Sequence, residues 1–345
     1  MKISDLGEFG LIDILTEMSN RTRDEKHIVW KKLIKGIGDD AAAWQGDNSI
    51  KLATTDFLIQ GVHFPVEPAS WQALGWKAMA ANLSDIAAMG GTPLYALVSL
   101  ALPGETEVDC VTDLYRGILE IANQHGAAIV GGDMSSAPMM IINITVLGSN
   151  EKRGNPILLR STARPGEKIA VTGFLGASAA GLKMMQENLR LPTEDATCLR
   201  QAFEKPHPRI AEGQLLAEYG VRTAIDISDG LIQDLRHICQ ASHVGARVES
   251  EKIPIRPEVK NNFGEKALEL ALSGGEDYEL LFTASTAITL EIQETTEVPV
   301  TVIGEITKDN TGKIILVDKD KESFSIRERG WNHFNKDEKN RYEPF

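Results

Sequence analysis

The chain has 345 residues, of which 42% are hydrophobic and 25% charged, as in an ordinary globular protein rather than a disordered or fibrous one. That length predicts two domains. The formal net charge of −13 argues against the basic surface that binds nucleic acid, although carboxylates can hold anionic small molecules through divalent cations.

The cysteines and the N-terminal sequence indicate the compartment. Cys110, Cys198 and Cys239 lie far apart and form no C-x-x-C pair, which argues against a disulfide framework and a zinc site and favours a reducing compartment. The first residues carry no apolar core of a signal peptide, and no apolar run reaches the length that spans a bilayer. We therefore expect a cytoplasmic protein with no membrane partner.

The first half of the chain is predicted to alternate helices and strands, as an α/β domain does. Two glycines beside two acids in Gly36–Ala42 predict a tight loop before the first long strand. Apolar residues at helical spacing from Trp71 predict a helix that ends at Gly90. The predicted elements are helices within 1–35, 71–89 and 108–125 and strands at 51–59, 94–102, 127–130 and 139–147.

A polar run at 148–155 predicts the boundary between two domains, residues 1–150 and residues 151–345. The second domain again mixes strands and helices, and its polar tail is expected to be loosely ordered. Its predicted elements are strands at 168–172, 223–227, 246–250, 278–283 and 298–306, and helices from 178 and at 198–203, 209–219, 230–241 and 267–272.

The aspartates of the first domain recur at predicted strand ends and loop-to-helix junctions, mostly beside small or hydroxyl side chains. Such neighbours leave room for a hydrated magnesium ion and a phosphate. Asp85, in the run Asn82–Gly90, lies among apolar side chains, where a carboxylate is rarely buried unless it is paired or binds a metal. A single Asp is more often explained by turn or capping chemistry, but four of them in one α/β domain favour a metal role equally, so both roles stay open. The residues are Asp40, Asp56, Asp85 and Asp133.

Two further patterns lie in the second domain. In Asp226–Gly230 the acids and Ser228 could hold a metal or phosphate, or merely cap the following helix. Adjacent glycines in Ser273–Tyr278 allow a ligand to approach the backbone, or make a plain turn. No P-loop motif occurs, and the glycines of Val171–Ser178 lack dinucleotide spacing, so we read that segment only as a weak nucleotide candidate.

These segments together resemble the thiamine-monophosphate kinase family, within the ATP-binding superfamily that includes aminoimidazole ribonucleotide synthetase. The resemblance implies an α/β (α+β) chain with a two-domain aminoimidazole ribonucleotide synthetase-like fold. It implies an N-terminal sheet domain that forms a barrel in a homodimer and a C-terminal α/β domain. The matching segments are Gly7–Ile12, Gly36–Ala42, Thr54–Asp56, Gly61–Phe64, Asn82–Gly90, Gly131–Asp133, Asp226–Leu231, Ser273–Thr283 and Gly330–Phe334.

The resemblance also implies a reaction, in which ATP phosphorylates thiamine monophosphate to thiamine diphosphate with several magnesium ions as cofactor. The metal ligands it implies are Asp40, Thr54, Thr55, Asp56, Asp85, Asp133, Asp226 and Asp229. The implied ATP contacts are Tyr115, Gly132, Asp133, Arg160 and Ser228, near the dimer interface. The implied contacts to thiamine monophosphate are His63, Glu276 and Trp331.

No general base is expected, because the second pKa of a phosphate monoester is about 6 and the attacking oxygen is already ionised. Thr162, where the family usually has Gly, and Glu167, where it usually has Asp, are departures that affect the loop near Arg160. Two alternatives stay open. One is another ATP-dependent enzyme of the superfamily, such as an amidine cyclase, and the other is a non-catalytic sensor of nucleotide or thiamine phosphate.

Overall fold

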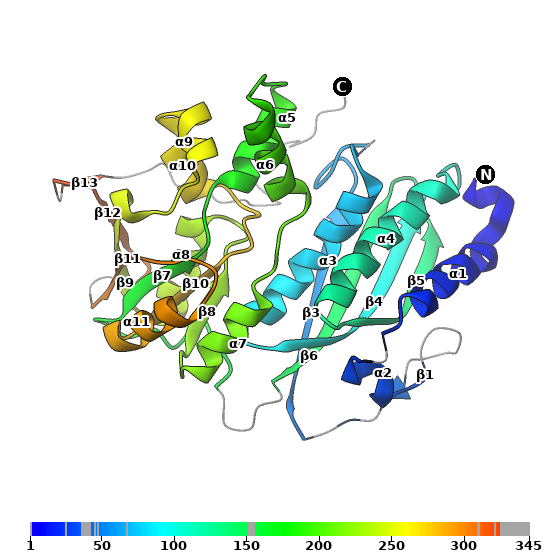
Figure 1. The fold of residues 1–345 in the computed structure, drawn as a ribbon, viewed down its shortest axis with the longest axis horizontal. Coiled ribbons are helices and arrows are strands. Elements are labelled where there is room, and N and C mark those ends of the chain that lie inside the picture. The colour runs from blue at the N-terminus through cyan, green and yellow to red at the C-terminus, as the bar shows by residue number, and fades with distance from the viewer. Residues whose placement is uncertain are drawn as a thin grey trace. The chain divides into compact units, whose positions relative to one another are not determined.

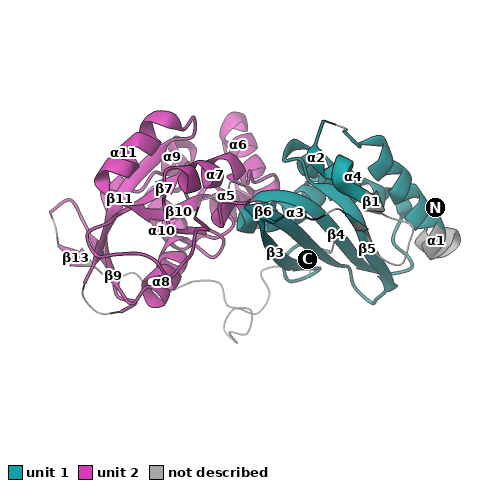
Figure 2. Cartoon of the chain, turned by 90° about the horizontal axis from the view of Figure 1, so that it is seen from below, with its two compact units in different colours: residues 1–86, 92–151, 332–345 teal, residues 87–91, 152–331 magenta. Residues whose placement is uncertain are grey.

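The computed structural model describes residues 2–24, 26–35, 43–44, 46, 48–66, 68–150, 156–308, 311–320 and 322–324. The chain divides into two compact units (Figure 2). Unit 1 comprises Met1–Ile86, Thr92–Glu151 and Asn332–Phe345, and unit 2 comprises Ala87–Gly91 and Lys152–Trp331. The two-domain α/β architecture that the sequence predicts is therefore present.

Unit 1 is built on a four-stranded mixed sheet in the order β3-β6-β4-β5 (Figure 1). Its strands are β3 (Ile50–Ile59), β4 (Thr92–Leu102), β5 (Ala128–Ser136) and β6 (Ile141–Asn150). β6 is antiparallel to β3 and β4, whereas β4 and β5 are parallel and need the helical crossover between them. The remaining elements are α1 (Ile3–Arg21), α2 (Ile28–Lys32), β1 (Leu33–Lys35), β2 (Ala43–Trp44), α3 (Trp71–Ala88) and α4 (Val108–Gln124).

Helices α3 and α4 lie against one face of this sheet and cross each other closely (Figure 1). Two glycines make the close crossing possible. A Cβ on Gly75 of α3 would lie 1.8 Å from the carbonyl oxygen of Leu114, and one on Gly117 of α4 would lie 1.8 Å from that of Gln72. Backbone therefore packs on backbone at this crossing, which fixes where α3 presents its side chains to the sheet.

Unit 2 is built on a seven-stranded mixed sheet in the order β13-β12-β9-β11-β7-β10-β8. Its strands are antiparallel apart from the β9–β12 pair. The strands β7 (Lys168–Thr172), β8 (Thr223–Asp226) and β10 (Leu280–Ala284) lie together, and their residues are almost continuously buried. The others are β9 (Gly245–Glu249), β11 (Val300–Thr307), β12 (Ile314–Val317) and β13 (Ser323–Phe324).

Strands and helices of unit 2 contribute to an apolar core that includes Val171, Leu235 and Leu281. α8 packs on β8, β9 and β10, and α11 packs on β7 and β11. The helices are α5 (Ala177–Gln186), α6 (Thr193–Glu204), α7 (Ile210–Glu218), α8 (Leu231–Ala241), α9 (Pro257–Phe263), α10 (Lys266–Ser273) and α11 (Thr286–Thr295), with a short 3₁₀ turn at Ser250–Lys252. The sequence interpretation missed α9, α11, β12 and β13.

One difference from the predicted elements bears on the site. The sequence interpretation ended the strand near Val130, before Gly131, Gly132 and Asp133, whereas β5 continues through all three to Ser136. Parallel pairing with β4 holds this glycine-containing stretch extended, with Ser99 opposite Asp133. Among the described residues, no helix is both long enough and apolar enough to cross a bilayer.

Candidate active site

The first candidate group joins Thr54 to Asp85, and Asp56 lies on the same face of β3 as Thr54. Residues of β3 alternate between faces, and Thr54 and Asp56 lie on the face that also buries Leu52 and Leu58. α3 packs over that face and brings Asp85 to β3, where the Thr54 hydroxyl donates a hydrogen bond to Asp85 Oδ2. Residues 31 positions apart in the sequence are therefore neighbours, as the implied ligand set requires.

Thr55 points to the opposite face of the sheet. Its hydroxyl accepts a hydrogen bond from Asn143 Nδ2 at 2.9 Å and lies 3.0 Å from the Thr145 hydroxyl. It also donates to the carbonyl oxygen of Ile144 at 3.2 Å. The Thr55 side chain is thus engaged in a cross-strand polar cluster, and only its backbone is near Thr54 and Asp56.

Asp133 lies on the other edge of the same sheet. The cross-strand row that contains it runs Phe57, Asn143, Ser99, Asp133, so it is level with the end of β3 but three strands away. At about 4.8 Å between neighbouring strands, the backbones are roughly 14 Å apart. Within one chain, the fold does not bring Asp133 beside Asp56 and Asp85.

Asp133 is close instead to Tyr115 and Gly132, which together line a cavity of about 80 Å³ between α1, α4 and the sheet. Ile12 and Leu15 of α1 supply part of its apolar wall. Gly132 is needed here, because a Cβ would lie 1.8 Å from the carbonyl oxygen of Val98. Burial raises the pKa of Tyr115, so its hydroxyl stays protonated. Three residues with implied ATP contacts are thereby brought together.

His63 follows β3 in a tight turn. The Nδ1 atom of His63 accepts a hydrogen bond from the backbone N–H of Ile59 at 3.0 Å. The backbone N–H of His63 donates to the carbonyl oxygen of Ile59 at 2.8 Å. A neutral imidazole in this arrangement carries its proton on Nε2. The turn therefore fixes the ring beside the end of the strand that holds Asp56.

In unit 2 the fold joins the two acidic loops that the sequence kept separate. The Glu276 N–H donates to the carbonyl oxygen of Ser228 at 2.8 Å, and the Tyr278 N–H donates to that of Ile227 at 2.9 Å. Gly275 has no room for a side chain, since a Cβ would lie 2.3 Å from the Ser228 carbonyl oxygen. The segments Asp226–Gly230 and Ser273–Tyr278 thus form one surface.

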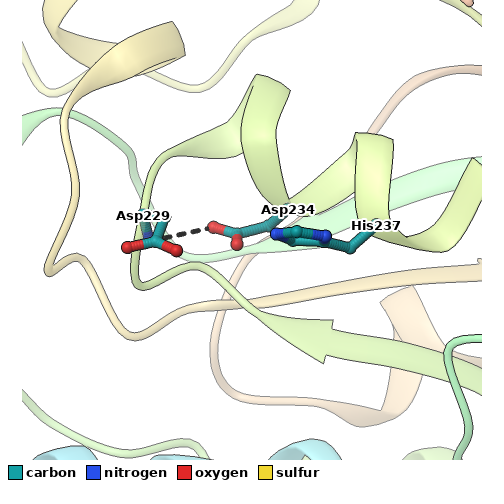
Figure 3. A group of neighbouring side chains, drawn as sticks. All are labelled: Asp229, Asp234 and His237. Carbon is teal, nitrogen blue, oxygen red and sulfur yellow. Dashed lines mark hydrogen bonds between the residues drawn. The ribbon is translucent and has the colours of Figure 1, made fainter. Parts of the chain in front are cut away.

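A carboxylate-histidine group lies at the start of α8 (Figure 3). Asp229, Asp234 and His237 each offer a ligand atom, and these atoms lie within 4.8 Å of one another. Asp234 Oδ2 also accepts the backbone N–H groups of Asp229 and Gly230, both at 3.1 Å. Burial, reinforced by the charges of Asp226 and Asp229, raises the pKa of Asp234 well above its ordinary value. A bound cation would relieve this concentration of acids.

Arg160 acts on the same group. Burial lowers the pKa of His237, and the positive charge of Arg160 lowers it further, against the opposing effect of Asp229. The Ser242 hydroxyl holds the Arg160 carbonyl oxygen at 2.8 Å. The backbone of Arg160 is thus anchored, and its exposed guanidinium lies within electrostatic range of His237.

Both departures near Arg160 are accommodated by hydrogen bonds. The Thr162 hydroxyl donates to the carbonyl oxygen of Arg222 and lies 2.7 Å from the hydroxyl of Thr223. Glu167 Oε2 accepts from the backbone N–H of Arg164 at 3.0 Å and from the hydroxyl of Thr283 at 2.7 Å. The loop is therefore anchored by the side chains that distinguish it.

The Gly-rich segment between β7 and α5 does not offer a free phosphate site. Asp277 Oδ2 accepts the N–H of Gly176 at 2.7 Å, and its Oδ1 accepts that of Ser178 at 3.3 Å. A carboxylate of the protein itself thus takes the place that a phosphate would occupy at the start of α5. This excludes the weak dinucleotide interpretation of Val171–Ser178.

Some functional predictions fall outside these groups. Asp40 and Trp331 lie outside the described residues. Asp234 and His237 were missed, although their i, i+3 spacing on a helix that follows Asp229 could have indicated them. The oxygen-rich donors Thr54, Asp56 and Asp85, like the acids around Asp229, suit Mg²⁺, which prefers carboxylates together with water and phosphate oxygens.

Comparison with known proteins shows the family. Residues 38–149 match the family described as AIR synthase related protein, N-terminal domain, and residues 164–317 match its C-terminal domain. The chain is 34% identical over 309 residues to the thiamine-monophosphate kinase of Bacillus subtilis, covering 87% of this chain and 93% of that relative.

Two solved structures are similar across nearly their whole length. The thiamine-monophosphate kinase of Stenotrophomonas maltophilia superposes with a TM-score of 0.79 at 35% identity, covering 92% of this chain and 98% of that one. AaThiL complexed with AMPPCP and TMP superposes with a TM-score of 0.74 at 32% identity, covering 97% and 99%.

Proposed function

The chain belongs to the thiamine-monophosphate kinase family, and from this premise we propose that it transfers the γ-phosphoryl group of ATP to the phosphate of thiamine monophosphate. The observation that carries the proposal is the hydrogen bond between Thr54 on β3 and Asp85 on α3, with Asp56 on the same face of β3 as Thr54. This group forms at the positions that the family resemblance assigns to metal ligands. The structural relative AaThiL is complexed with AMPPCP and TMP, which supports a site for both substrates.

The main barrier to this reaction is the electrostatic repulsion between the phosphates of ATP and the phosphate of thiamine monophosphate. Two unit charges about 4 Å apart repel by roughly 4 kcal/mol at an effective dielectric of about 20. Magnesium supplies charge neutralisation between the transferred and accepting phosphates when it is bound. The proposed ligands of such ions are Asp40, Asp56, Asp85, Asp133, Asp226 and Asp229.

The other proposed roles follow the groups described above. Tyr115 and Gly132 would contact ATP at the cavity, and Arg160 and Ser228 would contact its phosphates. His63, Glu276 and Trp331 would contact thiamine monophosphate. No residue is assigned as a general base, because the accepting phosphate oxygen is largely ionised at neutral pH. ATP as co-substrate fits a cytoplasmic location.

We further propose that the site is completed by a second copy of the chain. The cavity of about 80 Å³ is much smaller than the roughly 300 Å³ or more of an ordinary ligand pocket. Asp133 and Asp56 lie on opposite edges of one sheet. Closing two such sheets into a barrel would place the β5 edge of one protomer beside the β3 edge of its partner, so that both acids serve one ATP.

The proposed reaction is tested by product formation with purified protein, ATP and magnesium. Thiamine monophosphate should give ADP and thiamine diphosphate in equal amounts, whereas thiamine and formylglycinamidine ribonucleotide should give neither. ADP release with formylglycinamidine ribonucleotide would instead identify an amidine cyclase. Tight ATP binding without ADP release from any of the three would identify a sensor.

A further inference from the structure

The loop that carries Glu276 has an unusual backbone. Glu276 has φ = +67° and Tyr278 has φ = +52°, and neither is a glycine. Left-handed backbone is uncommon at side-chain-bearing residues and persists where the surroundings impose it. The groups that impose it here lie on either side of Tyr278.

The first is Glu279, whose buried carboxylate accepts three hydrogen bonds from two side chains. Arg209 donates to it through two nitrogens, Nε to Oε2 and Nη2 to Oε1, both at 2.6 Å. The Thr172 hydroxyl donates to Oε2 at 2.7 Å. Gly173 leaves the necessary space, because a Cβ there would lie 2.0 Å from Oε1. The Glu279 backbone carbonyl accepts the Ile227 N–H at 2.8 Å, so this residue also ties the loop to the Asp226–Gly230 segment.

The second is Asp277, which caps the start of α5 through the N–H groups of Gly176 and Ser178. Glu279 and Asp277 therefore fix both sides of Tyr278 to the same Gly-rich turn between β7 and α5. This explains the glycines of Val171–Ser178 without a nucleotide: they receive two carboxylates of the neighbouring loop.

Stability alone accounts poorly for the Arg209–Glu279 pair. A buried ion pair is a weak source of stability, because desolvating both charges offsets their attraction, and apolar side chains of similar volume often serve as well. Burial lowers the pKa of Arg209, but the hydrogen bonds and charge of Glu279, together with the charge of Glu212, outweigh burial and raise that pKa, so the guanidinium stays charged. What the pair supplies is a fixed, bidentate geometry next to the strained loop.

We propose that Arg209 and Glu279 are positioning residues, which hold the Ser273–Tyr278 loop so that the Glu276 side chain is presented to thiamine monophosphate. The inference rests on the proposed role of Glu276 in binding that substrate. Arg209 would act only through Glu276, without contacting the substrate itself. Its contribution to catalysis should therefore disappear when the Glu276 carboxylate is absent.

A double-mutant cycle tests this directly. Arg209→Lys keeps the charge but cannot make the bidentate contact, and we expect it to raise the KM for thiamine monophosphate about 10-fold while changing the KM for ATP less than about 3-fold. In a Glu276→Ala background the same change should alter the KM for thiamine monophosphate less than about 2-fold. An equal fold-change in both backgrounds would overturn the proposal.

A matched control is the exposed pair Lys168–Glu305 of the same unit, which is joined at 2.6 Å. Lys168→Met with Glu305→Met should leave both KM values unchanged. Hydrogen exchange supplies a readout that needs no substrate: Arg209→Lys should deprotect the amides of Glu276 and Tyr278 selectively. Uniform deprotection of the amides of unit 2, or no deprotection, would show that the Arg209–Glu279 pair does not position the loop. If the wild-type protein makes no thiamine diphosphate while the selective deprotection is seen, the proposed function fails and the positioning survives.

Discussion

Asp85 is a proposed metal ligand that α3 places beside β3. It lies in a helix of small and apolar side chains, yet it is only partly buried and receives the Thr54 hydroxyl. A carboxylate in such surroundings needs a partner, and carboxylate oxygens are also the ligands that a magnesium ion prefers.

Replacing Asp85 by Asn should preserve the fold, since the amide oxygen can still accept from Thr54, but remove the charge that holds magnesium. We expect turnover to fall about 100-fold or more at saturating magnesium, in line with the loss of one group that stabilises transition-state charge. Asp109→Asn, at an exposed acid in the first turn of α4, is the matched control. Near-normal turnover of Asp85→Asn would contradict the metal role.

Asp277 gives a prediction about pH. Burial raises its pKa to about 8, although the two backbone N–H groups oppose the shift. Its folded-state pKa then exceeds the unfolded value of about 4, so folding takes up a proton between these pH values. Stability from this group is complete below pH 4 and is lost as the pH rises through 8, with a slope of at most about 1.4 kcal/mol per pH unit.

Asp277→Asn removes this titration and should leave a smaller decline in unfolding free energy between pH 5 and pH 8. Chemical denaturation of both proteins across that range measures the difference. A wild-type stability that declines no faster than that of the variant would show that Asp277 is ionised in the fold.

At the scale of elements, the α3–α4 crossing determines where Asp85 lies. Gly75→Ala would place a methyl group 1.8 Å from the Leu114 carbonyl oxygen, so the helices must separate. We expect a loss of about 1–3 kcal/mol in unfolding free energy, as for other overpacked sites. Gly46→Ala, which meets open space in the same unit, should change stability by less than about 0.5 kcal/mol. Equal stability of Gly75→Ala and wild type would disprove the close crossing.

Elements with a strong local pattern were predictable from the sequence. The apolar spacing from Trp71 predicted α3 almost to its last residue, and the strand predicted at Lys51–Ile59 is β3. Asp133 was misplaced at a strand end because Gly131 and Gly132 suggest a break, whereas pairing with β4 keeps them extended. Local pattern carries no information about such partners.

The site was predictable only in part for the same reason. The sequence indicated the loops Asp226–Gly230 and Ser273–Tyr278 separately. Their contact depends on backbone hydrogen bonds such as that between Glu276 and Ser228, which are distant in the sequence. Asp234 was missed because its role comes from folding back onto the N–H groups of Asp229 and Gly230. The Arg209–Glu279 pair likewise joins residues 70 positions apart.

For the whole molecule, we propose that the acids on the two edges of the unit 1 sheet serve one site through a second copy of the chain. Dimer closure would explain why a single chain holds Asp56 and Asp133 on opposite edges, with only a small cavity beside Tyr115. Dimer closure also predicts that the loss of Asp56 or of Asp133 abolishes activity, because no other acid of the same chain can take its place.

The most direct test mixes two inactive variants, Asp56→Asn and Asp133→Asn, by co-expression with different affinity tags. If each site takes one acid from each protomer, a mixed dimer holds one intact site and one doubly altered site. A random mixture should then recover about a quarter of wild-type thiamine diphosphate formation. If both acids of a site come from the same chain, every site carries one defect and the mixture stays as inactive as either variant alone, which would contradict the shared site.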